Sequence, residues 1–560
     1  MAQPLPAPPP PQQGVIERVA PRPVPRLGPS LQPPEAPRAT GPGAAATVHV
    51  LRTAILGNTA LSEAELRALA AGLEGETVPL ARIEDARLAM LGAYRRAGYP
   101  YVAVTAGLVP VPGGVELRFA ATEGFVAEVR LEGDIGPAGA QALRFLERVV
   151  GQRPVTTAAL ERALLLTSDI PGVAVSGVLR PLAGEAGALQ LVVQLTRAAY
   201  SGYISLDNRG YELTGPWQGL LVAGLNSFTE FGERTEIAWL QAESNEQTFV
   251  QISEAFFLGG SGLRFRAYVG GGNARPGSVL AAIGYSGDTW VGGAGLAYPI
   301  IRSRPLNLSV LGQFDVFEGT VDLGLPDVPR TRDSVRALRL GLDASARDTL
   351  LAFAPAAAAT SGLLRLSNGI SDLGASDGSV DDVSRPGSEF GFTKIAGEVT
   401  RVQPLFEPTS GWLFGVAATL AGQWSDDALP PSERFYLGGT RLGRGFYAGQ
   451  VTGDKAFGVS AELQLSTGFN LDLGAGETRF ATQFYLFRDF GRAWQNEVPG
   501  GPAELPDSRL SSWGGGARFV INEWLQFDIE VAHRVTRQPQ GAGVEKLDAN
   551  AVFGRALVQF

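Results

Sequence analysis

The residues best equipped for chemistry lie in a long Gly-rich stretch of the C-terminal half, where Gly443, Arg444, Gly445 and Phe446 follow one another. A guanidinium group offers five N–H donors in a rigid fork. Glycine on either side removes the side chains that would keep the backbone away from a neighbouring surface. The pattern predicts a loop tip that packs closely against another part of the protein. A flexible surface loop with an incidental Arg is the alternative.

Bond-making chemistry is not indicated elsewhere in the chain. The sequence has no Cys, which excludes disulfides, thiolate metal sites and Cys nucleophiles. The two histidines, His49 and His533, are far apart and fit strand positions better than ligand or base positions. Glycine pairs such as Gly438-Gly439 fit turns or strands, and we find no nucleophile elbow, phosphate loop or metal-ligand cluster. We therefore expect no enzyme activity, no cofactor and no metal.

Composition narrows the class of protein. A chain of 560 residues exceeds one ordinary soluble core, so several domains are expected. The formal net charge of -9 argues against a nucleic-acid-binding protein. No apolar run is long enough for a membrane-spanning helix. Abundant glycine and sparse charge instead favour many short strands and turns.

The first 45 residues are rich in proline and include Pro8-Pro9-Pro10-Pro11. Such a segment cannot form a continuous helix. We interpret residues 1–45 as a linker, with a plug inside a pore as the alternative. Only the segment from Gln12 to Ala20 could form a helix.

Two consecutive units then share one order of elements, strand-helix-helix-strand-strand. A capping-box pattern, Ser62 with Glu65, marks the first helix of the first unit, which should run to about Leu73. The repeat predicts two small α+β domains at 46–122 and 123–198, each a sheet with two helices on one face. The expected strands are 48–56, 101–109, 115–121, 126–132, 173–180 and 188–196, and the expected later helices are 80–96, 137–150 and 156–166.

From Tyr200 onward we predict strands and no helix. Leu306, Leu308 and Val310, for example, alternate with polar residues. A period of two with one apolar face indicates half-buried strands, which a soluble barrel or sandwich would also show.

Three features favour a 16-stranded antiparallel transmembrane β-barrel at 199–560. We count about sixteen strands, an even number within the outer-membrane range. The last strand ends on Val558 and Phe560, which share one face. Connections after odd-numbered strands are mostly long and those after even-numbered strands mostly short, as in outer-membrane barrels. The long ones are 209–216, 272–288, 318–332, 369–388, 425–454, 491–509 and 535–548, and the short ones include 228–232, 258–261 and 521–522.

Several motifs resemble a known superfamily of POTRA-containing barrels. Tyr94-Arg95-Arg96-Ala97-Gly98-Tyr99-Pro100 looks like the helix end of a POTRA domain, and Thr122-Glu123-Gly124-Phe125 like the junction between two of them. Leu164 to Leu179 is similar to the second POTRA domain of two-partner-secretion transporters, the haemolysin secretion/activation proteins. Leu206-Asp207-Asn208-Arg209-Gly210 resembles their first barrel strand and loop, and the aromatic C-terminus resembles an outer-membrane assembly signal.

The resemblance also gives Arg444 a place and a partner. Gly443, Arg444, Gly445 and Phe446 match the motif at the tip of the superfamily's sixth extracellular loop, which folds into the lumen. Phe487 and Asp489 match a Phe-x-Asp motif that faces the lumen on the thirteenth strand. The resemblance implies that Arg444 bonds Asp489 bidentately beside Phe487, holding the loop 425–454 inward without a catalytic role. In the alternative interpretation, Asp489 simply ends a strand beside a turn.

The function implied by the resemblance is protein export across a bacterial outer membrane. POTRA domains in the periplasm would capture an unfolded secretory partner by strand addition, for which we expect the edge at Val173, Val175 and Val178. Outer-membrane lipid and the barrel-assembly machinery would be further partners, and no nucleic acid. A barrel-assembly or insertion factor of the same superfamily is the alternative. A plain porin would leave the Arg444 and Asp489 motifs unexplained.

Overall fold

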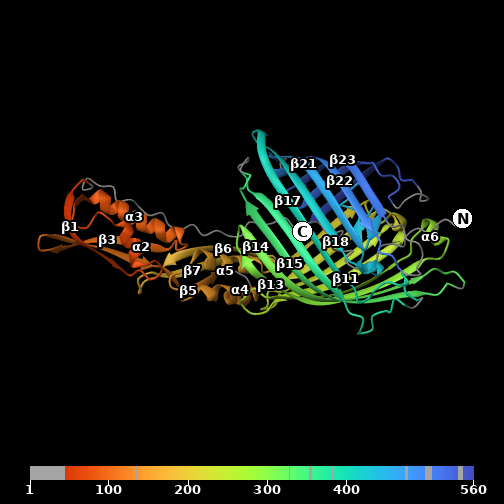
Figure 1. Cartoon of the computed structure of the whole chain (residues 1–560), viewed down its shortest axis with the longest axis horizontal. Helices are drawn as coiled ribbons and strands as arrows, with labels where there is room; N and C mark the ends of the chain where they lie inside the picture. The colour runs from red at the N-terminus through yellow and green to blue at the C-terminus, as the bar shows by residue number, and fades with distance from the viewer. Residues whose placement is uncertain are drawn as a thin grey trace.

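The computed structural model describes residues 45–133, 136–326, 328–351, 356–379, 382–472, 477–498, 507–539 and 546–560. Two small domains lie in line and extend from one end of a large barrel (Figure 1). The predicted linker or plug at residues 1–45 lies, apart from Ala45, outside the described residues. Within these ranges, none of the helices combines the length and apolar composition that a membrane crossing requires.

The first small domain is a mixed four-stranded sheet packed against two helices. The strand order is β2-β1-β4-β3, with β1 and β4 parallel. Its capping box is present, because Ser62 Oγ accepts from Glu65 N–H at 3.3 Å and the Glu65 carboxylate accepts from Ser62 N–H at 3.0 Å. The helix ends at Leu69, before the predicted Leu73. The elements are β1 (Thr47–Leu56), α2 (Glu63–Leu69), β2 (Thr77–Pro79), α3 (Leu80–Arg96), β3 (Val102–Val111) and β4 (Gly114–Glu123).

The second small domain repeats this plan without a counterpart of β2. Its strand order is β5-β7-β6, with β5 and β7 parallel, so β5 and β6 are the two edges of the sheet. The elements are β5 (Phe125–Glu132), α4 (Ala138–Leu146), the 3-10 turn η1 (Glu147–Val149), α5 (Thr157–Ser168), β6 (Val173–Pro181) and β7 (Ala188–Arg197). The predicted repeat of strand-helix-helix-strand-strand therefore describes both domains, apart from the three-residue β2.

Sixteen strands close into one antiparallel barrel, as the sequence predicted. The first eight are β8 (Tyr200–Asp207), β9 (Gln218–Asn226), β10 (Arg234–Ala242), β11 (Gln247–Phe257), β12 (Arg264–Ala274), β13 (Ser286–Arg302), β14 (Leu306–Asp322) and β15 (Thr331–Asp348). The last eight are β16 (Ala358–Gly369), β17 (Thr393–Thr409), β18 (Trp412–Trp424), β21 (Lys455–Asp472), β22 (Glu477–Trp494), β23 (Asp507–Ile521), β24 (Leu525–Arg534) and β25 (Asn550–Gln559).

The two faces of the barrel strands differ in chemistry. On β15, Leu338 and Leu340 are 47% and 55% exposed on the outside, whereas the Arg339 side chain between them is 15% exposed and turned to the lumen. An apolar outer face and a polar lumen are the arrangement of a barrel that sits in lipid.

The bounds of several barrel connections, and the presence of helical turns, differ from the sequence prediction. The predicted loop 318–332 shortens to 323–330, because β14 continues to Asp322 and β15 begins at Thr331. Helical turns also occur after Tyr200. They lie in connections rather than in the barrel wall, as the one-turn α6 (Ser278–Ala281) does at the end away from the small domains (Figure 1).

The second small domain is fastened to the barrel rim. Arg302, at the end of β13, donates two hydrogen bonds to Asp169 at 2.6 and 2.8 Å. Phe257, at the end of β11, is buried in the core of the small domain and meets Phe145 edge-on, with ring centroids 5.1 Å apart. These and further side-chain bonds involve the turns 227–233 and 258–263 and the hairpin end 299–304.

Candidate functional site in the barrel lumen

The connection between β18 and β21, residues 425–454, folds into the lumen and is called the inward loop below. It contains the 3-10 turn η4 (Pro431–Glu433) and a hairpin of β19 (Phe435–Leu437) with β20 (Val451–Gly453). Between these strands, the N–H of Gly438 donates to the Leu442 carbonyl at 2.8 Å, which tightens the tip. Gly438, Gly439 and Gly443 have φ of +102°, +94° and +82°, a region that glycine adopts without steric cost.

Arg444, at the tip, reaches the barrel wall at Asp489 on β22. Its guanidinium donates from Nε to Oδ2 at 3.1 Å and from Nη2 to Oδ1 at 2.9 Å. Its main-chain N–H donates to Oδ2 at 2.7 Å. The Phe487 ring, two residues earlier on β22, has its centroid 3.9 Å from the guanidinium carbon. Since both charged residues are buried, this contact replaces water for each of them.

The neighbouring strand β21 adds a second acid to the site. Ser460 lies opposite Asp489 in the strand register, and Glu462 lies opposite Phe487. Arg444 donates to Glu462, and to Ser460 Oγ at 2.9 Å. Glu462 also accepts from Arg518 on β23 at 2.8 and 3.1 Å. Arg444 of the loop and Arg518 of β23 therefore pair with the acids of β21 and β22, and each of these four charges has a partner of opposite sign.

The glycines beside Arg444 let the loop backbone touch β23. A Cβ on Gly443 would lie 2.6 Å from the Leu510 side chain, and one on Gly445 would lie 2.6 Å from Ser512 Cβ. The Gly445 N–H donates to Ser512 Oγ at 3.2 Å, and its carbonyl accepts from Arg534 Nε at 2.5 Å. The close approach predicted for these two glycines is present at both positions.

Phe446, the last residue of the tip motif, is fully buried. It belongs to an apolar cluster inside the barrel that joins the loop to its wall. The cluster also contains Ala421, Leu437, Leu442, Val451, Ala456, Ala493 and Leu510.

The base of the inward loop has its own anchor on another part of the wall. Glu433 accepts from Arg339 on β15 at 2.8 and 3.1 Å and pairs with Lys394 on β17 at 2.7 Å. Arg339 also donates to Asp315 on β14 at 2.6 Å. The loop is therefore attached at its base to β15 and β17 and at its tip to β21, β22 and β23.

The end of the loop is tied to two further connections by Asp454. Its carboxylate accepts from Arg385, in the connection between β16 and β17, at 2.8 and 3.0 Å. It also accepts from the main-chain N–H groups of Leu429 and Asn496 at 2.9 and 2.8 Å. Asp454 is fully buried, so these hydrogen bonds have a structural role: they join the inward loop to the neighbouring connections at the same end of the barrel.

Sequence reasoning missed most of these anchoring charges. Glu462, Arg518 and Arg339 all occupy lumen-facing positions, which the period of two identifies. The period does not say which lumen charge meets which, because that depends on the strand register and on where the loop enters.

The other predicted positions lie outside the lumen. On β6, Val173 is buried, Val175 packs against the domain core, and Val178 is 54% exposed. Val558 and Phe560 face outward at the end of the chain. The Phe560 N–H and carbonyl exchange hydrogen bonds with Gly202 on β8 at 3.0 and 2.9 Å.

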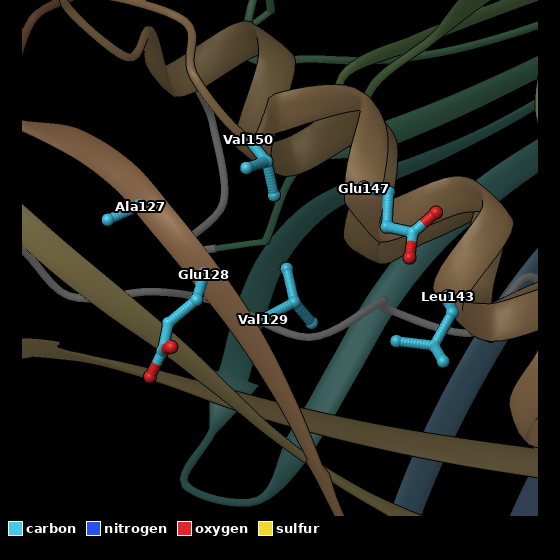
Figure 2. Close-up of a pocket in the computed structure, with 6 residues that line it drawn as sticks. All are labelled: Ala127, Glu128, Val129, Leu143, Glu147 and Val150. Atoms are coloured by element: carbon cyan, nitrogen blue, oxygen red, sulfur yellow. The ribbon is translucent and has the colours of Figure 1, made fainter.

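A shallow groove of about 460 Å³ lies beside the other edge strand of the second small domain. Figure 2 shows that it runs between β5 and the helical segment α4-η1. Its lining comprises Ala127, Glu128, Val129, Leu143, Glu147 and Val150. The second small domain thus presents the two edge strands β5 and β6, and an apolar groove with acidic side chains accompanies β5.

Comparisons with known proteins place this geometry among related folds. Residues 363–540 match the Omp85 superfamily domain. The heme/hemopexin transporter protein HuxB of Haemophilus influenzae strain 86-028NP is 22% identical over 377 residues, which is 67% of this chain and 63% of HuxB. The chain therefore spans less than two thirds of that relative.

Solved structures extend the likeness over nearly the whole fold. CdiB from Escherichia coli matches with a TM-score of 0.71 at 17% identity, covering 94% of this chain and 93% of CdiB. CdiB from Acinetobacter baumannii matches with a TM-score of 0.62 at 17% identity, covering 98% and 96%. BamA from Haemophilus ducreyi lacking POTRA domains 1–3 matches with a TM-score of 0.52 at 13% identity, covering 91% and 100%.

The comparisons agree with the resemblance read from the sequence motifs. An Omp85 superfamily domain forms part of a closed 16-stranded barrel, and two POTRA-like domains precede it. The matched CdiB structures share this fold over nearly the whole chain, barrel and small domains included. Residues 363–540 of this chain therefore resemble the Omp85 superfamily domain, and the chain as a whole has the fold of CdiB.

Proposed function

We propose that the protein is the transporter of a two-partner secretion system. Its POTRA domains capture an unfolded secretory protein in the periplasm, and the barrel exports this protein to the cell surface. The observation that carries the proposal is the joint arrangement of two POTRA domains docked on the barrel rim and an inward loop anchored at both base and tip. This arrangement holds a capture site next to a conduit. It needs no catalytic step, cofactor or metal.

Capture by strand addition fits the β6 edge of the second POTRA domain, whereas the start of the β5 edge is already bridged by Val150. An added strand pairs through its backbone groups, so this kind of binding depends little on the sequence of the cargo and suits an unfolded protein. On β6, Val178 is exposed beside the edge, whereas Val173 and Val175 face the domain core and support the strand from behind.

Arg444 and Asp489 act as positioning residues in this proposal. They hold the loop tip against β22, which sets the width and the shape of the conduit. Outer-membrane lipid surrounds the apolar face of the barrel. The assembly machinery would recognise the final strand with Val558 and Phe560 during biogenesis.

The experiment co-expresses the protein with the large secreted proteins encoded near its gene and measures each of them in the medium. The even-numbered residues of β6 lie in the hydrogen-bonded pairs with β7, so the Gly177 N–H points to the free edge. Gly177→Pro should reduce secretion, since proline removes this donor for an added strand. Gly177→Ala keeps the N–H, is the matched control and should leave secretion unchanged. Loss of other barrel proteins from the outer membrane when the gene is deleted, with no secreted protein affected, would instead favour an insertion factor.

A further inference from the structure

The barrel closes where its last strand, β25, meets its first strand, β8, and this junction is called the seam below. Strand pairing across the seam runs from Tyr203 opposite Gln559 to Asp207 opposite Arg555. On its other side β25 stays paired with β24 as far as Asn550. The regular ladder of the seam therefore covers the C-terminal half of β25 and stops short of its first residue, Asn550.

Asn208 continues the seam where the ladder stops. Its side-chain Nδ2 donates to the Val552 carbonyl at 3.0 Å, and its Oδ1 accepts from the Gly554 N–H at 2.8 Å. A carboxamide carries the same donor and acceptor as a peptide group, so this side chain stands in for one more step of strand pairing.

Arg209 crosses the seam completely. Its guanidinium carbon lies 4.0 Å from the centroid of the Phe553 ring on β25, and its Nη2 donates to Glu530 Oε1 on β24 at 2.7 Å. Glu530 lies directly opposite Phe553 in the register, so the Arg209 side chain passes over the last strand to the one before it. The Arg209 and Glu530 side chains are 8% and 6% exposed.

The same residues touch the inward loop. Glu530 Oε2 accepts from the Tyr485 hydroxyl on β22 at 2.8 Å. Tyr447, which follows the loop-tip motif, meets Phe553 edge-on with ring centroids 5.9 Å apart. Arg209 Nη1 also lies 3.4 Å from the Gly439 carbonyl at the turn of the loop. A change at the seam therefore reaches the loop tip through direct contacts.

We propose that Asn208 and Arg209 form a clasp that keeps the seam closed on its lumen side and helps to position the inward loop. Asn208 pairs with β25, and Arg209 fastens the first strand to β24 through Phe553 and Glu530. Both are positioning residues. The proposal concerns the barrel itself and does not depend on the identity of a cargo or on secretion.

The test records single channels of the purified full-length protein in planar bilayers. Arg209→Gln and Glu530→Gln should each increase the frequency of current fluctuations severalfold, because each breaks the ion pair across the seam. Arg479→Gln is the matched control. It removes an ion pair with Glu523 on the same barrel, but one whose side chains are 69% and 81% exposed, and it should leave the traces unchanged.

A disulfide separates the seam from other effects of the charge change. Ser205 and Leu557 lie directly opposite each other across the seam, both 1% exposed. Because the chain has no Cys, Ser205→Cys with Leu557→Cys gives one defined cross-link when oxidised. Oxidation should return the Arg209→Gln channel to wild-type fluctuations, and reduction should reverse this.

The outcomes are decisive in each direction. Fluctuations that persist in Arg209→Gln with the cross-link formed would overturn the clasp, as would single variants that match the Arg479→Gln control. Should the single variants fail to assemble, shown by loss of the heat-modifiable band in SDS gels, the oxidised cross-link should restore assembly. Failure to restore it would also contradict the proposal.

Discussion

Asp489 accepts hydrogen bonds from both the guanidinium and the main-chain N–H of Arg444. A change at Arg444 removes the side-chain donors and leaves the main-chain bond. A change at Asp489 removes all of these bonds at once. The two residues are therefore unequal members of the pair, and variants of each should differ in a defined way.

Arg444→Ala should lower the free energy of unfolding of the barrel by about 3 kcal/mol, because Asp489 keeps its buried charge without the guanidinium. Asp489→Ala should cost less, since Arg444 retains Glu462 and Ser460. Tryptophan fluorescence can follow this transition specifically, because all eight Trp residues lie in the barrel segment. Equal effects of the two substitutions would contradict this hierarchy.

Phe487→Leu should reveal the stacking of the ring on the guanidinium. The substitution loses buried volume in any background, so the single variant alone is not informative. In a double-mutant cycle with Arg444→Ala, we expect a coupling of about 1 kcal/mol, the scale of a desolvated cation–π contact. A coupling near zero would mean that Phe487 serves only to fill space.

Gly445→Ala should destabilise the loop tip by steric clash with Ser512, and the clash should be relieved by Ser512→Gly in the same chain. The relief should be partial, since Ser512 Oγ also accepts from the Gly445 N–H. Gly443→Ala should resist the same kind of rescue, because a φ of +82° strains any added side chain. The measurement is the temperature at which the folded band disappears in SDS gels. If Leu510→Ala rescued Gly443→Ala as fully as Ser512→Gly rescues Gly445→Ala, backbone strain at Gly443 would be contradicted.

Glu433→Gln should loosen the base of the inward loop and leave the tip attached. Glu433 faces both Arg339 and Lys394, so the substitution leaves two cations with less compensation. A thiol introduced by Ser432→Cys, at a buried position in a chain without Cys, should react severalfold faster with a maleimide in this variant. Arg444→Ala should accelerate the same thiol less. The reverse order would show that base and tip are not separate anchors.

Acid should destabilise the first POTRA domain through Glu123. Burial raises the pKa of its carboxyl, but hydrogen bonds from Ala60, Thr59 and Tyr94 outweigh burial and hold the pKa below its ordinary value. A folded pKa below the unfolded one gives stability that is present above about pH 4.3 and lost as the pH falls through the folded pKa. The urea midpoint of this domain, followed by a dye on Thr105→Cys, should fall less between pH 6 and 3.5 in Glu123→Gln. An equal fall in both proteins would contradict the role of Glu123.

Local pattern was sufficient for much of this molecule. Alternation along each strand predicted the barrel and its lumen face, and glycines around an Arg predicted a tightly packed tip. The sequence did not predict that β14 extends to Asp322 and that β15 starts at Thr331. Beyond the apolar band both faces of a strand contact water, so apolar and polar residues no longer alternate there. The pairing of Arg444 with Glu462, or of Glu433 with Arg339, depends on strand register and on the path of a long loop. Neither is encoded in any single segment.

The contacts of the second POTRA domain lie along the rim from β9 to β14, on one side of the barrel. Under the proposed function, a polypeptide arriving from that domain approaches the lumen from this side. The wall across from this rim includes β21 and β22, which carry the anchors of the loop tip. In that proposal, cargo enters across from the strands that anchor the loop tip, so the loop lies between the entry side and its own anchors.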